Sequence, residues 1–280
     1  MIKVLNNITP SQHDDIYNIE FSFTQGEHRS MTCQNIITFD IETSNGWRQK
    51  DNSVIGFDHF KYNEKLTDNN GNYFENPMFD SEYKEKIDNG EPVSLLYVWQ
   101  CAIESQDGPK VFMGRTWDDY FTFLFKLTFE IRRQAVYGFK TVNREVESYC
   151  ALSAKYSVKI FTYIHNFGFE YQHLLNIFFN EFAGVGRGRK STHGNVFARQ
   201  ARKPMKGYFN MNKVKIEFRD TLSLTQKTLK NWCKDSNLPV QKLDEPGDYY
   251  LKIRTPNTPL VDDEINYIIN YAYKYRMNDL

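Results

Sequence analysis

The stretch IITFDIETSN, residues Ile36 to Asn45, decides the fold class and carries the first functional signal. It is an apolar, β-branched run in which two carboxylates, Asp40 and Glu42, stand two residues apart. Side chains at i and i+2 of a strand share a face, so both carboxylates point the same way while Ile41 faces the opposite layer. Neighbouring carboxylates repel each other and lose hydration unless a cation lies between them. The stretch therefore predicts either a strand that holds a divalent metal ion or a solvated sheet edge.

The composition is that of a globular protein and carries no global electrostatic signal. The 280 residues are 40% hydrophobic and 25% charged, with a formal net charge of +0. A polyanionic partner would therefore have to bind a local basic surface. Aromatic residues make up 16% of the chain, which is typical of a large aromatic core or of stacking on unpaired bases.

The cysteines and the hydropathy of the sequence indicate the cellular compartment of the protein. The four cysteines are far apart, with no CxxC pair and no histidine at zinc spacing, which indicates reduced core thiols. No signal peptide and no apolar run of membrane-spanning length is evident. We expect a soluble cytoplasmic protein, in the host cell cytoplasm if it is viral, with no membrane partner.

The hydrophobic pattern predicts an α/β protein with a mixed central sheet flanked by helices. We expect residues 1–33 to form an N-terminal arm or edge strand, and residues 34–280 to form one domain with an insertion at about 44–91. The expected strands are 34–41, 94–103, 111–113, 159–164, 195–200 and 207–218. The expected helices are 117–133, 143–155, 171–182, 225–234 and 263–275.

A second signal is YIHNFGFE, residues 163–170, where a strand ends, a glycine-containing turn follows and a helix begins. Strand ends and helix N-termini are where α/β folds place their sites. Glu170 could therefore reach a metal beside Asp40 and Glu42. The alternative is structural: Glu170 is an acid favoured by the helix dipole, and His165-Asn166 caps a turn.

Three elements together resemble the successive exonuclease motifs of the family B DNA polymerases, most closely the protein-primed branch of bacteriophages and linear plasmids. They are FDIET at 39–43, the 163–170 element and DTL at 220–222, and the match covers about residues 34–270. The resemblance implies a ribonuclease-H-like (DEDD) 3′–5′ exonuclease fold in which four carboxylates hold two Mg²⁺ or Mn²⁺ ions. Hard oxygen ligands suit these ions, and two ions can stabilise the attacking and leaving oxygens of an in-line displacement.

By this resemblance, Asp40, Glu42 and Glu170 are catalytic metal ligands. Glu170 replaces the family's more usual Asp, so its extra methylene must be accommodated.

The fourth ligand of the family lies in a helical Tyr-x-x-x-Asp motif, and here two alternatives stay open. Tyr271 stands where the acid is expected, whereas Tyr275 and Asp279 satisfy the motif two turns later. Positions 271 and 279 are about 12 Å apart along a helix. Either Asp279 is the ligand, with Tyr275 beside the attacking water, or the motif is broken at 271.

The same resemblance assigns DNA contacts. Thr43, Asn166 and Phe169 match positions that grip a single-stranded 3′ end, with the Phe ring on an unpaired base. The other matching positions, near DNA or the priming protein, are Tyr163, His165, Thr221 and Leu222. We expect Asp220 to support the site rather than to bind metal.

Lys242 and the basic stretch 187–206 can each be interpreted either as part of a nucleic-acid site or as ordinary solvated surface. Lys242, in the segment 238–244, matches a family lysine that lies over the scissile phosphate, and is otherwise an exposed lysine. The acid-free stretch 187–206 is either a local phosphate-binding patch or a solvated hairpin.

The resemblance implies the metal-dependent 3′–5′ exonuclease (proofreading) portion of a protein-primed family B DNA polymerase, acting on single-stranded 3′ ends during viral or plasmid DNA replication. No palm or thumb motif follows, so we expect a split or interrupted polymerase gene. The expected partners are single-stranded DNA, a polymerase remainder on a separate chain and a priming terminal protein. The alternatives are a catalytically impaired module that binds single-stranded DNA or the priming protein, and an exoribonuclease of the same fold.

Overall fold

The computed structural model describes residues 11–27, 30–68, 70–138, 157–180, 194–200 and 203–237, together with residues 260 and 265. The chain divides into two compact units. Unit 1 contains Met1–Asp40, Gln100–Lys242 and Val261–Leu280, and unit 2 contains Ile41–Trp99 and Leu243–Leu260. Two long strands, β3 (Ile37–Arg48) and β7 (Glu91–Ile103), run from one unit into the other. The domain boundaries expected from the sequence stay a prediction.

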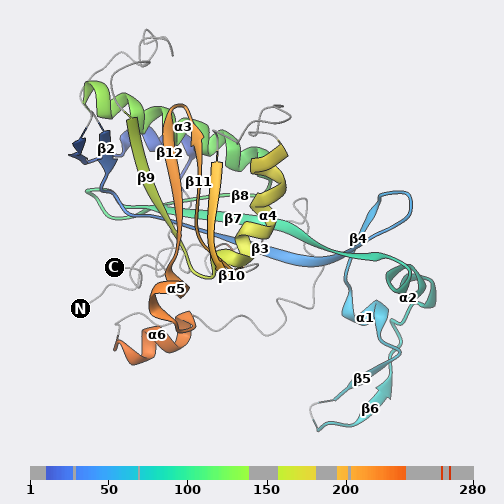
Figure 1. Cartoon of the computed structure of the whole chain (residues 1–280). Coiled ribbons are helices and arrows are strands. Elements are labelled where there is room, and N and C mark those ends of the chain that lie inside the picture. The colour runs from blue at the N-terminus through green and yellow to red at the C-terminus, as the bar shows by residue number, and fades with distance from the viewer. Residues whose placement is uncertain are drawn as a thin grey trace. The chain divides into compact units, whose positions relative to one another are not determined.

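A large mixed sheet with helices beside it confirms the α/β class. Among the described residues ten strands form this sheet, with a main path in the order β10-β11-β12-β9-β3-β7-β8. Besides β3 and β7, this path contains β8 (Lys110–Gly114), β9 (Ser157–Ile164), β10 (Gly194–Gln200), β11 (Lys203–Met211) and β12 (Val214–Asp220). β9 is parallel to β3 and β12, whereas β10, β11 and β12 pair antiparallel in succession (Figure 1).

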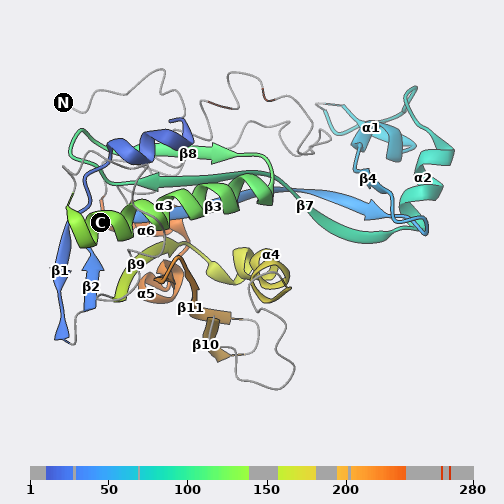
Figure 2. The same cartoon turned by 90° about the horizontal axis from the view of Figure 1, so that it is seen from above.

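The N-terminal segment joins the same sheet. A 3-10 helix, η1 (His13–Asn18), lies beside α3 (Trp117–Tyr137) (Figure 2). β1 (Phe23–Gln25) pairs with β2 (Ser30–Cys33), and β2 pairs with β9.

Three further helices belong to unit 1. They are α4 (Phe167–Asn180), α5 (Thr221–Thr225) and α6 (Leu229–Asp235). In the part of the chain that the structure describes, no helix combines the length and apolarity needed to cross a membrane.

An aromatic layer fills the space between the sheet and its helices in unit 1. Phe39 of β3 stacks on Tyr120 of α3 with ring centroids 4.5 Å apart. Phe218 of β12 stacks on Phe167 of α4 at 5.7 Å and on Phe209 of β11 at 5.9 Å. All five rings are buried. The layer places α3 and α4 on the same face of the sheet.

Unit 2 has more regular structure than its composition indicates. The strand expected to end at residue 41 continues to Arg48, and β4 (Val54–Gly56) pairs with its last residues. Beyond β4 the chain forms two capped helices and a two-stranded sheet. These elements are α1 (His59–Tyr62), β5 (Lys65–Thr67), β6 (Tyr73–Glu75) and α2 (Ser81–Asp88).

Other expected elements differ in detail. The strand expected at 207–218 is a hairpin, because Asn212 and Lys213 adopt left-handed φ values of 51° and 59° and reverse the chain between β11 and β12. The helix expected at 225–234 is divided into α5 and α6, and α4 begins at Phe167 rather than at residue 171. The expected helix 143–155, and 263–275 apart from Ile265, lie outside the described residues.

The described cysteines are buried free thiols, as expected. Cys33, Cys101 and Cys233 are buried. Burial raises the pKa of the Cys33 thiol to about 12. Cys150 lies outside the described residues.

A buried ionic network fastens the N-terminal segment to α3. Arg133 donates from Nε to Glu130 Oε2 at 2.8 Å and from Nη2 to Glu130 Oε1 at 2.6 Å. Gln134 Nε2 donates to Glu130 and to the Ile19 carbonyl, and Gln134 Oε1 accepts from the Phe21 amide at 2.8 Å. Both charged side chains are at most 1% exposed, so each requires the other.

Glu130→Ala should lower the free energy of unfolding by roughly 3–5 kcal/mol, because it leaves the Arg133 guanidinium buried without its carboxylate. Urea denaturation followed by circular dichroism measures the change. The double variant Glu130→Ala/Arg133→Met is the control and should recover a substantial part of the loss. A single variant as stable as the wild type would contradict the prediction.

Candidate functional site

Asp40 of β3 and Glu170 in the first turn of α4 lie together at one end of the sheet. Thr38 pairs with Tyr163, so Asp40 lies one residue past Ile164, where β9 ends and the turn to α4 begins. Glu170 is 3% exposed, and its side chain lies within hydrogen-bonding reach of Asp40. The structure thus brings together two of the predicted ligands that are far apart in the sequence.

The carboxylate of Glu170 is poorly stabilised by its surroundings. Its Oε2 is buried and, among the described residues, has no hydrogen-bond partner. Burial, and next the negative charge of Asp40, raise the pKa of Glu170 well above its ordinary value, and Asp220 adds to the effect. A carboxyl group in this position is neutralised by a proton or by a cation.

Gln100 completes the arrangement and was not predicted from the sequence. Its Nε2 donates to Asp40 Oδ2 at 3.3 Å, and its buried Oε1 has no partner within the described part of the chain. Gln100 is 1% exposed between two buried apolar residues of β7. A single polar residue inside an apolar strand was the available signal, but it does not reveal the partner.

These oxygens fit a divalent cation of the Mg²⁺ or Mn²⁺ type. Asp40 and Glu170 supply carboxylate oxygens and Gln100 an amide oxygen, which are the ligands that hard cations prefer. Across the described ranges, no group of three or more His, Cys, Asp or Glu side chains is arranged to hold a metal ion. Glu42 lies two residues beyond Asp40 on β3, in unit 2, and its role as a ligand stays a prediction.

Asp220 holds the loop that carries Glu170. Its Oδ1 accepts hydrogen bonds from the backbone amides of Asn166, Phe167 and Leu222 at 3.0–3.2 Å. Its Oδ2 accepts from the amide of Ser223 at 3.0 Å and from the Ser223 hydroxyl. Both oxygens are therefore occupied by donors at the starts of α4 and α5, which suits a supporting residue rather than a metal ligand.

The predicted DNA-contacting residues other than Thr43, which belongs to unit 2, lie in this loop or at the strand and helix ends next to it. Phe169 is 42% exposed, and Asn166 is exposed with a left-handed φ of 69°. The ring of His165 is held by Thr221, whose hydroxyl lies 3.1 Å from His165 Nδ1 and is itself buried. Leu222, Tyr163 and Thr43 are partly buried. Their contacts with DNA stay predictions.

Several predicted site residues lie outside the described residues. They are Lys242, Tyr275 and Asp279, together with Tyr271. Their roles, and the choice between an intact and a broken last motif, therefore stay predictions.

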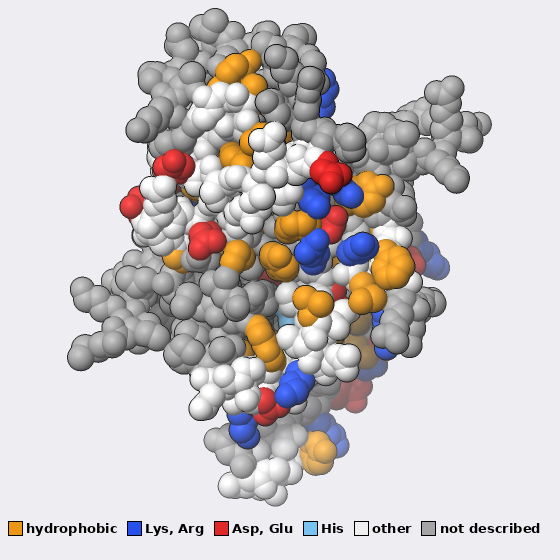
Figure 3. Space-filling model, turned by 60° about the vertical axis from the view of Figure 1, so that its left-hand side comes forward, with side chains coloured by type: hydrophobic (Ala, Val, Ile, Leu, Met, Phe, Trp, Pro, Cys, Tyr) orange, Lys and Arg blue, Asp and Glu red, His pale blue; other side chains and the backbone are white. Residues whose placement is uncertain are grey.

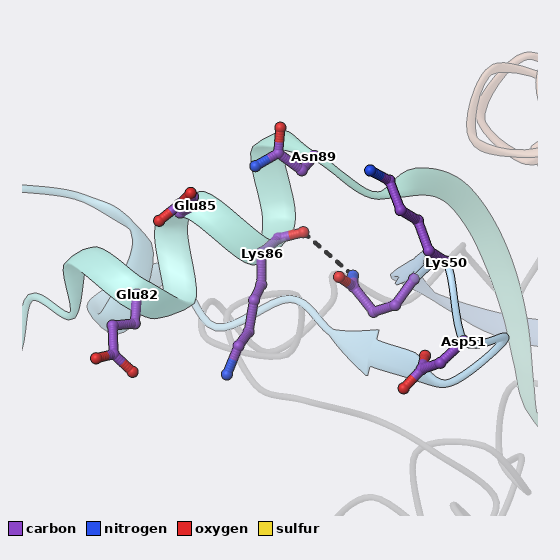
Figure 4. Close-up of a pocket in the computed structure, with 7 residues that line it drawn as sticks. Lys50, Asp51, Glu82, Glu85, Lys86 and Asn89 are labelled. Atoms are coloured by element: carbon purple, nitrogen blue, oxygen red, sulfur yellow. Dashed lines mark hydrogen bonds between the residues drawn. The ribbon is translucent and has the colours of Figure 1, made fainter.

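A pocket of about 680 Å³ in unit 2 is a separate feature (Figure 4). Its lining residues are Gln49, Lys50, Asp51, Glu82, Glu85, Lys86 and Asn89. The Gln49 amide donates to the Lys86 carbonyl at 3.1 Å, which joins the β3–β4 turn to α2. None of these lining residues belongs to the predicted site, and their charges are of both signs.

Comparisons with known proteins give structural matches only. No protein-family model and no curated protein matches this sequence. Phi29 DNA polymerase complexed with primer-template DNA and incoming nucleotide matches with 12% identity and a TM-score of 0.48, over 88% of this chain and 30% of that chain. The same polymerase with single-stranded DNA matches with 14% identity and a TM-score of 0.42, over 66% of this chain and 28% of that chain. The chain thus spans less than a third of that polymerase.

Glu170→Gln should raise the free energy of unfolding of the metal-free protein at about pH 8 by at least roughly 1 kcal/mol, because it removes a buried, poorly paired charge. The folded-state pKa of Glu170 is raised, so its contribution to stability is complete below the unfolded-state pKa and is lost as pH rises through the folded-state pKa. The gain should therefore shrink at about pH 4.

Urea denaturation in EDTA at the two pH values measures this effect. The matched control is Glu85→Gln, an exposed glutamate of α2, which should change stability little at either pH. A Glu170→Gln variant that is less stable than the wild type at both pH values would contradict the prediction.

Asn166→Ala should be less stable than Asn166→Gly by about 1 kcal/mol, because only the alanine variant opposes the left-handed backbone with a Cβ atom. Thermal unfolding of both variants measures the difference. If Asn166 also contacts DNA, Asn166→Gly should keep the fold and weaken binding of a single-stranded oligonucleotide. Equal stability of the two variants would contradict the conformational role.

Proposed function

We propose that this protein is a divalent-metal-dependent 3′–5′ exonuclease that acts on single-stranded 3′ ends of DNA. The observation that carries the proposal is the contact of the partly buried Asp40 with the buried Glu170. Among the described residues, Glu170 Oε2 and the neighbouring Gln100 Oε1 are buried without a hydrogen-bond partner. The proposal includes a ribonuclease-H-like (DEDD) fold for the sheet. It also includes a proofreading role, as part of a protein-primed family B DNA polymerase.

The metal requirement follows from the ligand set. Asp40, Glu170 and the amide oxygen of Gln100 would hold a Mg²⁺ or Mn²⁺ ion, with Glu42 and Asp279 as further predicted ligands for a second ion. A bound ion would stabilise the negative charge that develops on a phosphate during hydrolysis. Among the described residues no arginine or lysine pairs with Glu170, so a metal ion is the natural counter-charge.

The neighbouring residues suit the binding of an unpaired 3′ end. Phe169 precedes Glu170 on α4 and exposes its ring, which offers a surface on which a terminal base can stack. The Asn166 amide and the ring of His165 lie on the preceding turn. Together these groups would bind the last nucleotide and orient its phosphate toward the carboxylates.

The reaction is the hydrolysis of the last phosphodiester. The oxygen of a water molecule forms a bond to phosphorus while the bond from phosphorus to the 3′ oxygen of the preceding nucleotide breaks. The released 3′ oxygen takes up a proton, and the water loses one to solvent or to a neighbouring base. The products are a nucleoside 5′-monophosphate and a strand that is shorter by one nucleotide.

A second candidate function is binding without cleavage. The described residues hold no cluster of three acidic or other metal-binding side chains, and Asp279 lies outside them. If the last motif is broken, the protein would hold single-stranded DNA or a priming protein for a polymerase partner. The same assay distinguishes the two functions.

Wild-type protein should shorten a 5′-labelled single-stranded oligonucleotide from its 3′ end in the presence of Mn²⁺ or Mg²⁺. Asp40→Asn should slow this reaction by more than roughly 100-fold, because even the outer partners of metal ligands contribute about 10- to 100-fold. Denaturing gel electrophoresis of the products measures the rate. A ribonucleotide strand of the same sequence tests the exoribonuclease alternative.

The control is Asp88→Asn, which removes an exposed carboxylate of α2 that is paired with Lys84 and should leave the rate unchanged. Binding of the oligonucleotide by wild-type protein without any shortening, in either metal, would favour the second function. Equal rates for the wild type and Asp40→Asn would contradict the proposed metal site.

A further inference from the structure

One face of the sheet in unit 1 carries a strip of basic and aromatic side chains that the proposed metal site does not use. Residues that pair across neighbouring strands share a face, so the register defines the strip. One row across the strands is Phe161, Glu217 and Tyr208, and the next is Tyr163, Arg219, Lys206 and Phe197. A third row is Lys159, Lys215 and Asn210. We call these residues of β9, β12, β11 and β10 the outer strip.

Cations lie over the rings of Phe161 and Tyr208 in the outer strip. The Arg219 guanidinium lies 3.6 Å from the centroid of Phe161, and Lys215 Nζ lies 3.9 Å from the centroid of Tyr208. Lys159 Nζ lies 4.5 Å from the Phe161 centroid. Alternating cations and rings on a sheet surface offer both charge for phosphates and planar faces for bases.

The outer strip is accessible and has a net positive charge. Its four cations face one carboxylate, Glu217, which pairs with Arg219 at 3.0 Å and with Lys215 at 3.6 Å. The Arg219 and Lys215 side chains remain 39% and 38% exposed, whereas that of Glu217 is 10% exposed. Lysine and arginine side chains gather beside hydrophobic ones in the space-filling view (Figure 3).

A pocket of about 260 Å³ opens on the strip between β10, β11 and β12. Phe197, Lys206, Tyr208 and Lys215 line it, and Phe197 is 56% exposed. The carboxylate of Glu217 also lines the pocket. An exposed ring beside two lysines that outnumber this carboxylate suits an anion that carries a flat ring.

The outer strip also leads toward Asp40. Thr38 pairs with Tyr163, and Asp40 is two residues further along β3 on the same face. A strand lying along the outer strip would therefore run toward the end of the sheet where the carboxylates lie.

We propose that the outer strip binds single-stranded DNA, with phosphates on the lysines and Arg219 and a base on the exposed ring of Phe197. Base stacking requires unpaired bases, since the faces of bases in a duplex are already covered by their neighbours. The binding needs no metal ion, so it stands independently of the proposed nuclease activity.

Fluorescence anisotropy of a labelled oligothymidylate with the full chain, in EDTA, tests the proposal. Phe197→Ala should weaken binding roughly tenfold, as expected for the loss of one stacked base. Lys215→Gln should reduce the slope of log affinity against log salt concentration by about 0.7. Glu217→Gln should strengthen binding, because it removes the carboxylate that competes with phosphates for Arg219 and Lys215.

The controls come from the β5–β6 hairpin of unit 2, which carries an exposed ring and an exposed lysine. Phe74→Ala and Lys65→Gln should leave the affinity unchanged. Binding by the wild-type protein in EDTA separates this proposal from the metal site. Circular dichroism checks that Phe197→Ala, whose ring is more than half exposed, remains folded.

Three results would overturn the proposal. They are equal affinities for Phe197→Ala and Phe74→Ala, binding of a duplex as tightly as of a single strand, and loss of binding by the wild-type protein in EDTA. Tighter binding of oligouridylate than of oligothymidylate would assign the outer strip to RNA instead of DNA.

Discussion

The hydrogen bonds accepted by the Asp220 carboxylate are the constraint on which the site depends. Asp220 is the last residue of β12, and its carboxylate accepts hydrogen bonds from backbone amides at the beginning of both α4 and α5. Because β12 is parallel to β9 and Asp220 pairs with Ile164, both strands end at the same level. One side chain thus joins two strand ends to two helix starts, and the first turn of α4 is held where Glu170 meets Asp40.

The site concentrates unfavourable electrostatics in a region that is otherwise well packed. Among the described residues, Glu170 and Gln100 each keep a buried oxygen without a hydrogen-bond partner, and Glu170 lies against a second carboxyl group. Beside them, Phe39 and Phe218 anchor an aromatic layer that buries large apolar surfaces. Local strain of this kind persists only where the surrounding packing is strong, and it is typical of functional sites.

Periodicity in the sequence was sufficient to predict the elements with regular apolar patterns, including β7, β9 and α3. It was not sufficient where polar residues occupy a strand, as in β3 beyond residue 41, or where a turn lacks glycine, as at Asn212 and Lys213. The approach of Glu170 to Asp40 was expected only by combining separate motifs. The contact of Gln100 depends on strand order, and the outer strip depends on the register of four strands, which local sequence patterns do not encode.

Successive side chains of β12 point to opposite faces of the sheet, so the register of this strand decides which residues reach each face. Arg219 and Asp220 are adjacent, yet their side chains lie on opposite faces of the sheet. Arg219 contributes a cation to the outer strip, whereas Asp220 holds the starts of the two helices. A slip of this strand by a single residue would exchange the two faces. It would direct a guanidinium toward backbone amides, which are donors themselves, and would remove the acceptor that both helices need. The register of β12 against β9 and β11 therefore sets both surfaces at once, the carboxylate site through Asp220 and the outer strip through Arg219.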